Sequence, residues 1–123
     1  MRVKHVKIGI KSVKEILKDT AETMKRLERG ERLKPVKEPE IYFTSFEAFR
    51  KAMTPKRLEL LHIIKAKKPS SINELARVAK RDIKNIAEDV KYLEQIGLVE
   101  KKATDHKTKP VIDYDKIALE IAV

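Results

Sequence analysis

The N-terminal part of the chain changes its hydrophobic period once. Three apolar residues alternate with polar or small ones near the start: Val6, Ile8 and Ile10. This period of two predicts a half-buried strand within residues 1–10. Ser12 and Glu15 then form a capping box, and apolar positions recur every three or four residues up to Gly30. We therefore expect a strand followed by a helix of about five turns.

The stretch 31–40 holds two prolines and no periodicity, so it is predicted to be an extended linker. A short strand at 41–44 and a short helix at 45–53 are expected after it. Four aromatic residues cluster there: Tyr42, Phe43, Phe46 and Phe49. Packing in a core or an interface is favoured for them over a ligand cage.

Two well-capped helices open the second half. Thr54 is a good cap before Pro55, and the apolar stripe that follows ends before Pro69. The stripe consists of Leu58, Leu61 and Ile64, with Leu60 as a further candidate. Ser71 and Glu74 form a second capping box, which predicts a short helix immediately after it.

A third helix is predicted over residues 81–96, after a tight basic turn at 79–81. Gly97 gives its C-terminal stop. We expect one side of this helix to face the core: Ile83, Ile86, Ala87, Val90, Leu93 and Ile96.

The period then returns to that of strands. Short strands are predicted at 98–102 and 111–114, separated by the polar loop "ATDHKTKP", and a last strand alternates at Ile117, Leu119, Ile121 and Val123. The order helix, helix, helix, strand, loop, strand predicts an α+β winged helix-turn-helix with an N-terminal strand-helix arm. We expect an arm and connector over 1–53 and a winged helix-turn-helix domain over 54–123.

Composition narrows the partners. The 123 residues carry 29 Lys and Arg against 19 Asp and Glu, and the net charge of +10 favours a polyanion. No apolar run could span a bilayer, there is no cysteine, and residues 1–10 hold no signal-peptide core, so a cytoplasmic protein is expected. One Gln, two Asn and abundant Lys, Glu and Ile lean toward a thermophilic source.

The helix-turn-helix carries the clearest candidate chemistry. Its second helix enters the major groove by its N-terminal residues. Arg81, Lys84 and Asn85 are the expected base readers, because Arg and Lys suit guanine and Asn suits adenine. Contacts with the DNA backbone are expected at Lys80 and Lys91, and Ser71 is a further candidate DNA-binding residue. An ordinary solvated face is the alternative, and it gains weight from three nearby carboxylates: Asp82, Glu88 and Asp89.

The segment between the two wing strands is also basic. Lys101, Lys102, Lys107 and Lys109 lie within nine residues, and only Asp105 opposes them. We expect Lys102, Lys107 and Lys109 to hold DNA phosphates, with a flexible solvated loop as the alternative.

The N-terminal helix has a broad apolar stripe, which predicts an interface. The candidate dimerisation residues are Val13, Leu17, Met24 and Leu27. By contrast, the three histidines are isolated, and no catalytic constellation or phosphate loop occurs. The expectation is therefore a homodimer that is not an enzyme and holds no metal or cofactor.

Three segments resemble a known family: "MTPKRLELLHII", "SINELARVAKRDIKNIAEDVKYLEQIGLVE" and "VIDYDKIALEI". They are similar to small archaeal and bacterial predicted transcriptional regulators with a MarR/ArsR-like winged helix. The resemblance covers most of the chain and implies recognition-helix positions for Arg81, Lys84 and Asn85. The wing departs from the family, because "ATDHKTK" lacks the Gly-rich tip.

The function predicted from these observations is sequence-specific binding of double-stranded DNA by a dimeric transcriptional regulator. The alternative from another class is a winged helix used for protein interaction, such as an antitoxin-like or complex-assembly subunit. Binding of RNA is a weaker alternative, since Tyr92 is the only aromatic side chain on the third helix.

Overall fold

The computed structural model describes residues 4–32 and 40–121. The chain divides into two compact units, one of residues 1–52 with 116–123 and one of residues 53–115. The predicted boundary near residue 53 agrees with this division, but the last strand belongs to the N-terminal unit and not to the winged domain. Residues 1–3, most of the predicted linker and Val123 lie outside the described residues.

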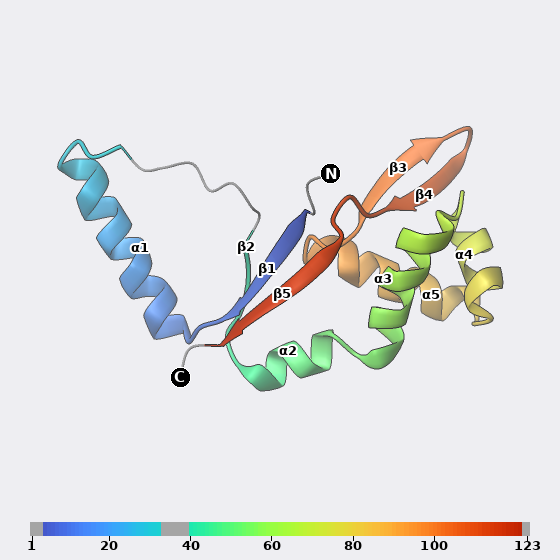
Figure 1. The fold of residues 1–123 in the computed structure, drawn as a ribbon, viewed down its shortest axis with the longest axis horizontal. Helices are drawn as coiled ribbons and strands as arrows, with labels where there is room; N and C mark the ends of the chain where they lie inside the picture. Colours follow the sequence, from blue (N-terminus) through green and yellow to red (C-terminus); the bar gives the residue numbers. More distant parts are fainter. Residues whose placement is uncertain (1–3, 33–39, 122–123) are drawn as a thin grey trace. The chain divides into compact units, whose positions relative to one another are not determined.

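The N-terminal unit is built on a parallel sheet with the strand order β2-β1-β5 (Figure 1). Its strands are β1 (His5–Ile10), β2 (Glu40–Phe43) and β5 (Lys116–Ile121), and its helices are α1 (Val13–Glu28) and α2 (Phe46–Ala52). Both neighbours run parallel to β1, with Ile8 opposite Ile41 and Leu119. The alternating pattern predicted all three strands, but it carries no information about which strands pair.

The two faces of this sheet differ. Val6, Ile8 and Phe43 are buried on one face, where the Phe49 ring of α2 meets Phe43 edge-on at 5.6 Å between ring centroids. On the other face Tyr42 lies over Gly9, where an added Cβ would come within 2.7 Å of the tyrosine ring. Aromatic packing is thus confirmed for the Phe43–Phe49 pair, whereas Tyr42 lies at the surface.

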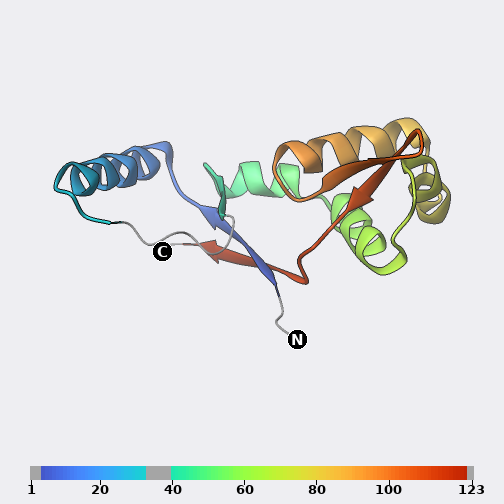
Figure 2. The same cartoon turned by 90° about the horizontal axis from the view of Figure 1, so that it is seen from above.

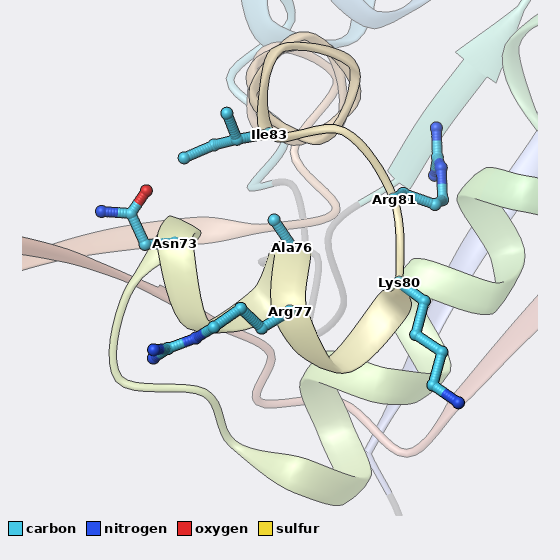
Figure 3. A pocket seen from close by; sticks show the side chains of 6 residues that line it. All are labelled: Asn73, Ala76, Arg77, Lys80, Arg81 and Ile83. Carbon is cyan, nitrogen blue, oxygen red and sulfur yellow. The ribbon is translucent and has the colours of Figure 1, made fainter.

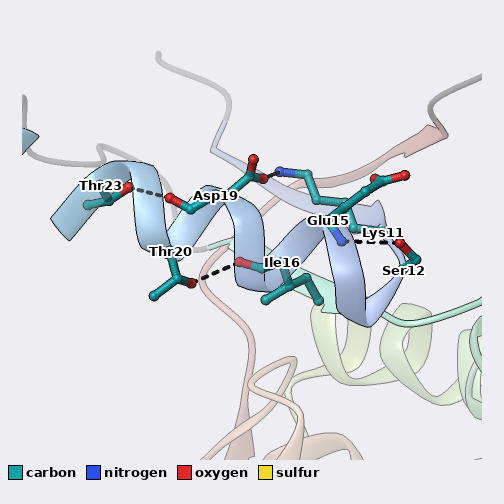
Figure 4. Close-up of polar contacts among 7 residues, drawn as sticks. All are labelled: Lys11, Ser12, Glu15, Ile16, Asp19, Thr20 and Thr23. Carbon is teal, nitrogen blue, oxygen red and sulfur yellow. Dashed lines mark hydrogen bonds and ion pairs between the residues drawn. The ribbon is translucent and has the colours of Figure 1, made fainter. Parts of the chain in front are cut away.

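Helix α1 follows the prediction in extent and capping (Figure 4). The Ser12 hydroxyl accepts a hydrogen bond from the Glu15 amide at 3.2 Å, as a capping box requires. Lys11 donates to Asp19 at 2.8 Å, and this hydrogen bond raises the pKa of Lys11 above its ordinary value. None of the residues of α1 is buried.

The C-terminal unit is a winged helix-turn-helix. Helices α3 (Pro55–Lys67), α4 (Ile72–Ala79) and α5 (Ile83–Gln95) are followed by the antiparallel hairpin of β3 (Glu100–Thr104) and β4 (Lys107–Val111) (Figure 2). Large apolar side chains from all three helices, together with Leu98 just before β3, form its core; the helical residues are Leu60, Ile64, Leu75, Ile86, Val90 and Leu93. The predicted fold class is confirmed.

A buried hydrogen bond fastens the end of the wing to this core. The Tyr114 hydroxyl donates to the backbone oxygen of Leu98 at 2.8 Å. Burial, with a smaller effect from Asp113, raises the pKa of Tyr114 well above its ordinary value. The hydroxyl therefore stays protonated and can serve as the donor.

Three expectations about this unit were wrong in detail. Leu58, Ile83 and Ala87 were predicted to face the core and are exposed instead. Ile83 and Ala87 lie four residues apart at the edge of the buried stripe of α5, so periodicity alone overestimates the width of that stripe.

The wing also differs from its prediction. Strand β4 lies almost wholly within the stretch predicted as a loop, and only Val111 of the strand predicted at 111–114 belongs to it, because the hairpin closes through only two residues, Asp105 and His106. Both have positive φ, 41° and 66°, the conformation that a tight two-residue hairpin turn needs. The absence of glycine concealed this turn in the sequence.

Among the described residues, no helix is long and apolar enough to cross a membrane.

Candidate nucleic-acid interface

A tight turn sets the angle between α4 and α5. Lys80 adopts the left-handed conformation after α4, and its amide donates to the carbonyl oxygens of Ala76 and Arg77. The amide of Arg81 also reaches the Ala76 oxygen, at 3.1 Å. The predicted basic turn is therefore confirmed as the hinge of a helix-turn-helix, with the Lys80 side chain exposed.

An open cleft of about 650 Å³ lies along this turn (Figure 3). Its lining comes from both helices: Asn73, Ala76, Arg77, Lys80, Arg81 and Ile83. Asn73 and Arg77 were missed in the sequence, although they lie four residues apart and thus on one face of α4. This spacing on the polar face of α4 is the signal in the sequence that indicates them.

The exposed face of α5 presents hydrogen-bonding and apolar groups together. Lys84, Asn85 and Lys91 are exposed, as predicted. Ile83 and Ala87, which are also exposed, lie beside Lys84 and Lys91, whereas Asn85 lies nearer to Arg81 and Asp89, four residues from each. Such a mixture can meet base edges, because amides and amines read donors and acceptors while apolar groups contact the thymine methyl.

Arg81 does not belong to that face. Its Nη2 donates to Asp89 Oδ2 at 2.8 Å, while Arg57 Nε from α3 donates to Asp89 Oδ1 at 3.1 Å. Only about 20% of the Arg81 side chain is exposed, and Figure 3 shows it on the far side of the turn from Asn73. The Arg81 side chain thus fastens the α4–α5 turn to Asp89 of α5, which Arg57 of α3 also binds, and this contact disfavours the predicted role of Arg81 as a base reader.

Arg57 extends the same network. Its guanidinium carbon lies 4.1 Å from the centre of the Tyr92 ring, a cation–π contact between α3 and α5. One carboxylate that would have repelled DNA, Asp89, is consequently neutralised by two arginines. Asp82 and Glu88 remain exposed on α5.

Ser71 also has a structural role instead of the predicted contact with DNA. The side chain is buried, and its hydroxyl oxygen accepts the Glu74 amide at 3.0 Å to cap α4. The Glu74 carboxylate in turn accepts hydrogen bonds from the hydroxyl and the amide of Ser70, which lower the pKa of Glu74. Capping boxes of this kind are local, and the spacing in the sequence had indicated one here.

The wing brings its lysines onto two faces. Lys102 and Lys109 are opposite each other on the two strands, and Lys107 stands next to the turn. Lys101 lies on the other face and pairs with Glu94 of α5 at 3.6 Å. The predicted set of Lys102, Lys107 and Lys109 is thus available on the hairpin, whereas Lys101 fastens the hairpin to α5.

Helix α1 carries a second kind of surface. The four predicted dimerisation residues are 53–64% exposed: Val13, Leu17, Met24 and Leu27. They lie on one stripe with Ile16 and Thr20, and the Thr20 hydroxyl donates to the Ile16 oxygen at 2.9 Å (Figure 4). Because the Thr20 hydroxyl already has a hydrogen-bond acceptor within the helix, a partner can cover the stripe without leaving this donor buried and unpaired.

Within the described residues, no group of three or more His, Asp or Glu side chains could hold a metal ion. The candidate functional features are therefore the apolar stripe of α1 and the basic surfaces of the C-terminal unit.

Comparison with known proteins identifies a family. The model of the HVO_A0114 family matches residues 52–119, more than half of the chain. Among curated proteins, none matches this sequence.

Two solved structures are similar in fold. One is the homodimeric winged helix-turn-helix DNA-binding domain of a possible ArsR-family transcriptional regulator from Mycobacterium bovis. It is 21% identical with a TM-score of 0.46, and the match covers 50% of this chain and 57% of that domain. The other is a predicted DNA-binding transcriptional regulator from E. coli, which is 19% identical with a TM-score of 0.49 and is covered over 84% of its length by 77% of this chain.

Proposed function

The chain belongs to the HVO_A0114 family, and we propose that this member is a sequence-specific double-stranded DNA-binding protein that acts as a transcriptional regulator. The observation that carries the proposal is the joint exposure of Lys84 and Asn85 on α5 beside the basic cleft of α4. A winged helix-turn-helix places these groups at the floor of the major groove.

Each surface has a distinct role in this proposal. Asn85 and Lys84 read base edges, and Ile83 and Ala87 contact thymine methyl groups. Arg77 and Lys80 of the cleft, Lys91 at the far end of α5, and the wing lysines Lys102, Lys107 and Lys109 bind phosphates. Arg81 and Ser71 hold the helices in place and do not touch the bases.

Selection of binding sites from random duplex DNA with the purified protein tests this assignment. A recovered motif establishes sequence-specific binding and gives the spacing of half-sites. Failure to enrich any motif, with the protein folded and monodisperse, would contradict sequence specificity.

Asn85→Ala distinguishes contacts that recognise bases from contacts that bind phosphates. An Asn amide paired with adenine contributes about 1–3 kcal/mol of discrimination, so the variant should lose preference at one base pair per half-site. Lys91→Ala is the matched control on the same helix and should weaken all sequences about equally. Unchanged base preference in Asn85→Ala would remove that residue from the reading surface.

The proposal includes a homodimer formed through the α1 stripe. A second copy presents the same stripe, so a two-fold axis can cover both exposed surfaces at once, and dimeric helix-turn-helix proteins use such symmetry to bind two half-sites. Leu17→Glu with Met24→Glu should give a monomer by sedimentation. Lys18→Glu with Lys25→Glu, on the opposite face of α1, should remain dimeric. A wild-type protein that is monomeric at tens of micromolar would refute the dimer.

A further inference from the structure

A second hollow lies between the C-terminal end of α3 and strand β4. Its volume is about 310 Å³, and four lysines line it: Lys65, Lys68, Lys102 and Lys109. Its other lining residues are all apolar, and two of them, Val111 and Ile112, are only half-buried and give it an apolar wall. We call it the lysine cleft. It shares no lining residue with the cleft between α4 and α5.

Positive charge is concentrated in this cleft beyond what the fold requires. Lys102 and Lys109 are direct cross-strand partners, and like charges in that position destabilise a hairpin. Lys65 pairs with Asp115 at 3.3 Å, but none of the described residues that line the cleft is acidic. An anion seated between the strands and α3 would relieve the repulsion between Lys102 and Lys109.

The fold holds these lysines in place from both sides. Lys68 ends α3 in the left-handed conformation, with its amide donating to the Ile64 oxygen at 3.2 Å. Lys102 and Lys109 are fixed by the register of the hairpin. The backbone positions of these lysines are therefore set before a ligand binds, and only their side chains have to become ordered.

We infer that the lysine cleft binds a small organic anion, an apolar body that carries a carboxylate. The apolar wall distinguishes this ligand from a DNA phosphate, which has no apolar part to cover Val111 and Ile112. Small-molecule sites have volumes of roughly 300–1,000 Å³ and combine apolar walls with a few polar groups, as the lysine cleft does.

The ligand would also regulate DNA binding. Lys102 and Lys109 are assigned to the DNA backbone in the proposed function, so an anion that occupies them competes with phosphate. This coupling rests on the proposed function, whereas the binding site itself does not. The two ideas can therefore fail separately.

A titration of the isotope-labelled full chain, followed by amide NMR, tests the site in the absence of DNA. The probes are 1-naphthoate, the uncharged 1-naphthamide and inorganic phosphate. We expect 1-naphthoate to shift amides of residues 64–68 and 109–112 saturably. The other two probes should bind at least about tenfold more weakly, because 1-naphthamide lacks the negative charge and inorganic phosphate lacks the apolar body.

Variants show whether the lysines hold the probe. Lys102→Ala with Lys109→Ala should weaken 1-naphthoate by at least about tenfold. Lys56→Ala with Lys67→Ala removes the same charge from exposed positions outside the cleft and should leave the affinity unchanged. Equal losses in both double variants would indicate a general charge effect and overturn the site.

The remaining outcomes are also decisive. No shift with 1-naphthoate, or shifts confined to residues 73–83, would overturn the site. Phosphate that binds as well as 1-naphthoate would show a simple cation cluster, and naphthamide that binds as well would show a purely apolar hollow. If 1-naphthoate binds in the cleft but leaves DNA affinity unchanged, the site stands and the coupling fails. If DNA does not bind at all, the proposed function fails and the site still stands.

Discussion

The carboxylate of Asp89 holds α5 to the rest of the C-terminal unit, and the cost of its removal can be calculated. It accepts hydrogen bonds from Arg57 at 3.1 Å and from Arg81 at 2.8 Å, and its side chain is only 16% exposed. In Asp89→Asn, the amide can accept from one arginine but must turn its NH₂ toward the other. One charge-assisted hydrogen bond is lost, and the attraction to both guanidinium groups disappears.

The magnitude follows from these contacts. A charge-assisted hydrogen bond contributes about 1.5–3 kcal/mol, and partial exposure of all three side chains favours the low end for each. We expect Asp89→Asn to lower the free energy of unfolding by about 2–3 kcal/mol. This corresponds to a fall in Tm on the order of 10 °C for a chain of this size.

Urea unfolding and thermal melting measure this effect. Glu88→Gln is the matched control, since it removes one charge from the neighbouring exposed position of α5, where the carboxylate forms no ion pair among the described residues. A double-mutant cycle with Arg81→Met should give a coupling of about 0.5–3 kcal/mol. If Asp89→Asn costs no more than Glu88→Gln, the network does not stabilise the fold as argued here.

Two further predictions concern the wing. Tyr114→Phe should destabilise the protein by about 1–3 kcal/mol in urea unfolding, because the buried Leu98 oxygen loses its donor, while Tyr92→Phe should cost less; equal costs would contradict this account. Asp105→Asn with His106→Gly should raise stability by about 1 kcal/mol, because Asn and Gly tolerate the positive φ of this turn better. An unchanged or lower Tm would argue against the left-handed turn.

Local signals predicted the helices well. Ser12 with Glu15, Thr54 with Pro55, and Ser71 with Glu74 all cap the helices that they were expected to cap. A cap depends on side chains within three residues of each other, so the sequence holds all of the required information.

Contacts between distant residues could not be predicted in the same way. The pairing of β5 with β1 joins the two ends of the chain, and the alternation of Leu119 and Ile121 is the same whichever strand lies beside them. The prediction of the nucleic-acid interface was incomplete for the same reason, since it could not include side-chain contacts in the folded unit. Arg81 has the charge and the position of a base reader, and only its distances to Asp89 show that it stabilises the helix pair instead.

The residues that sequence reasoning missed had a weaker but usable signal. Asn73 and Arg77 lie on α4, and attention to α5 alone left them out although helical spacing places them on the open face. The lysine cleft had no such signal, because its residues come from α3 and the hairpin and meet only in the folded unit.

The salt dependence of DNA affinity tests the central claim most directly. If the cleft, α5 and the wing neutralise about six to ten phosphates across a dimer, affinity for the selected duplex should fall by roughly 10³ to 10⁵ between about 50 and 200 mM salt. Lys107→Ala with Lys109→Ala should reduce the slope of log affinity against log salt, while Lys14→Ala with Lys18→Ala on α1 should not. An affinity that is nearly independent of salt, or a slope that the wing variant leaves unchanged, would contradict DNA binding by this surface.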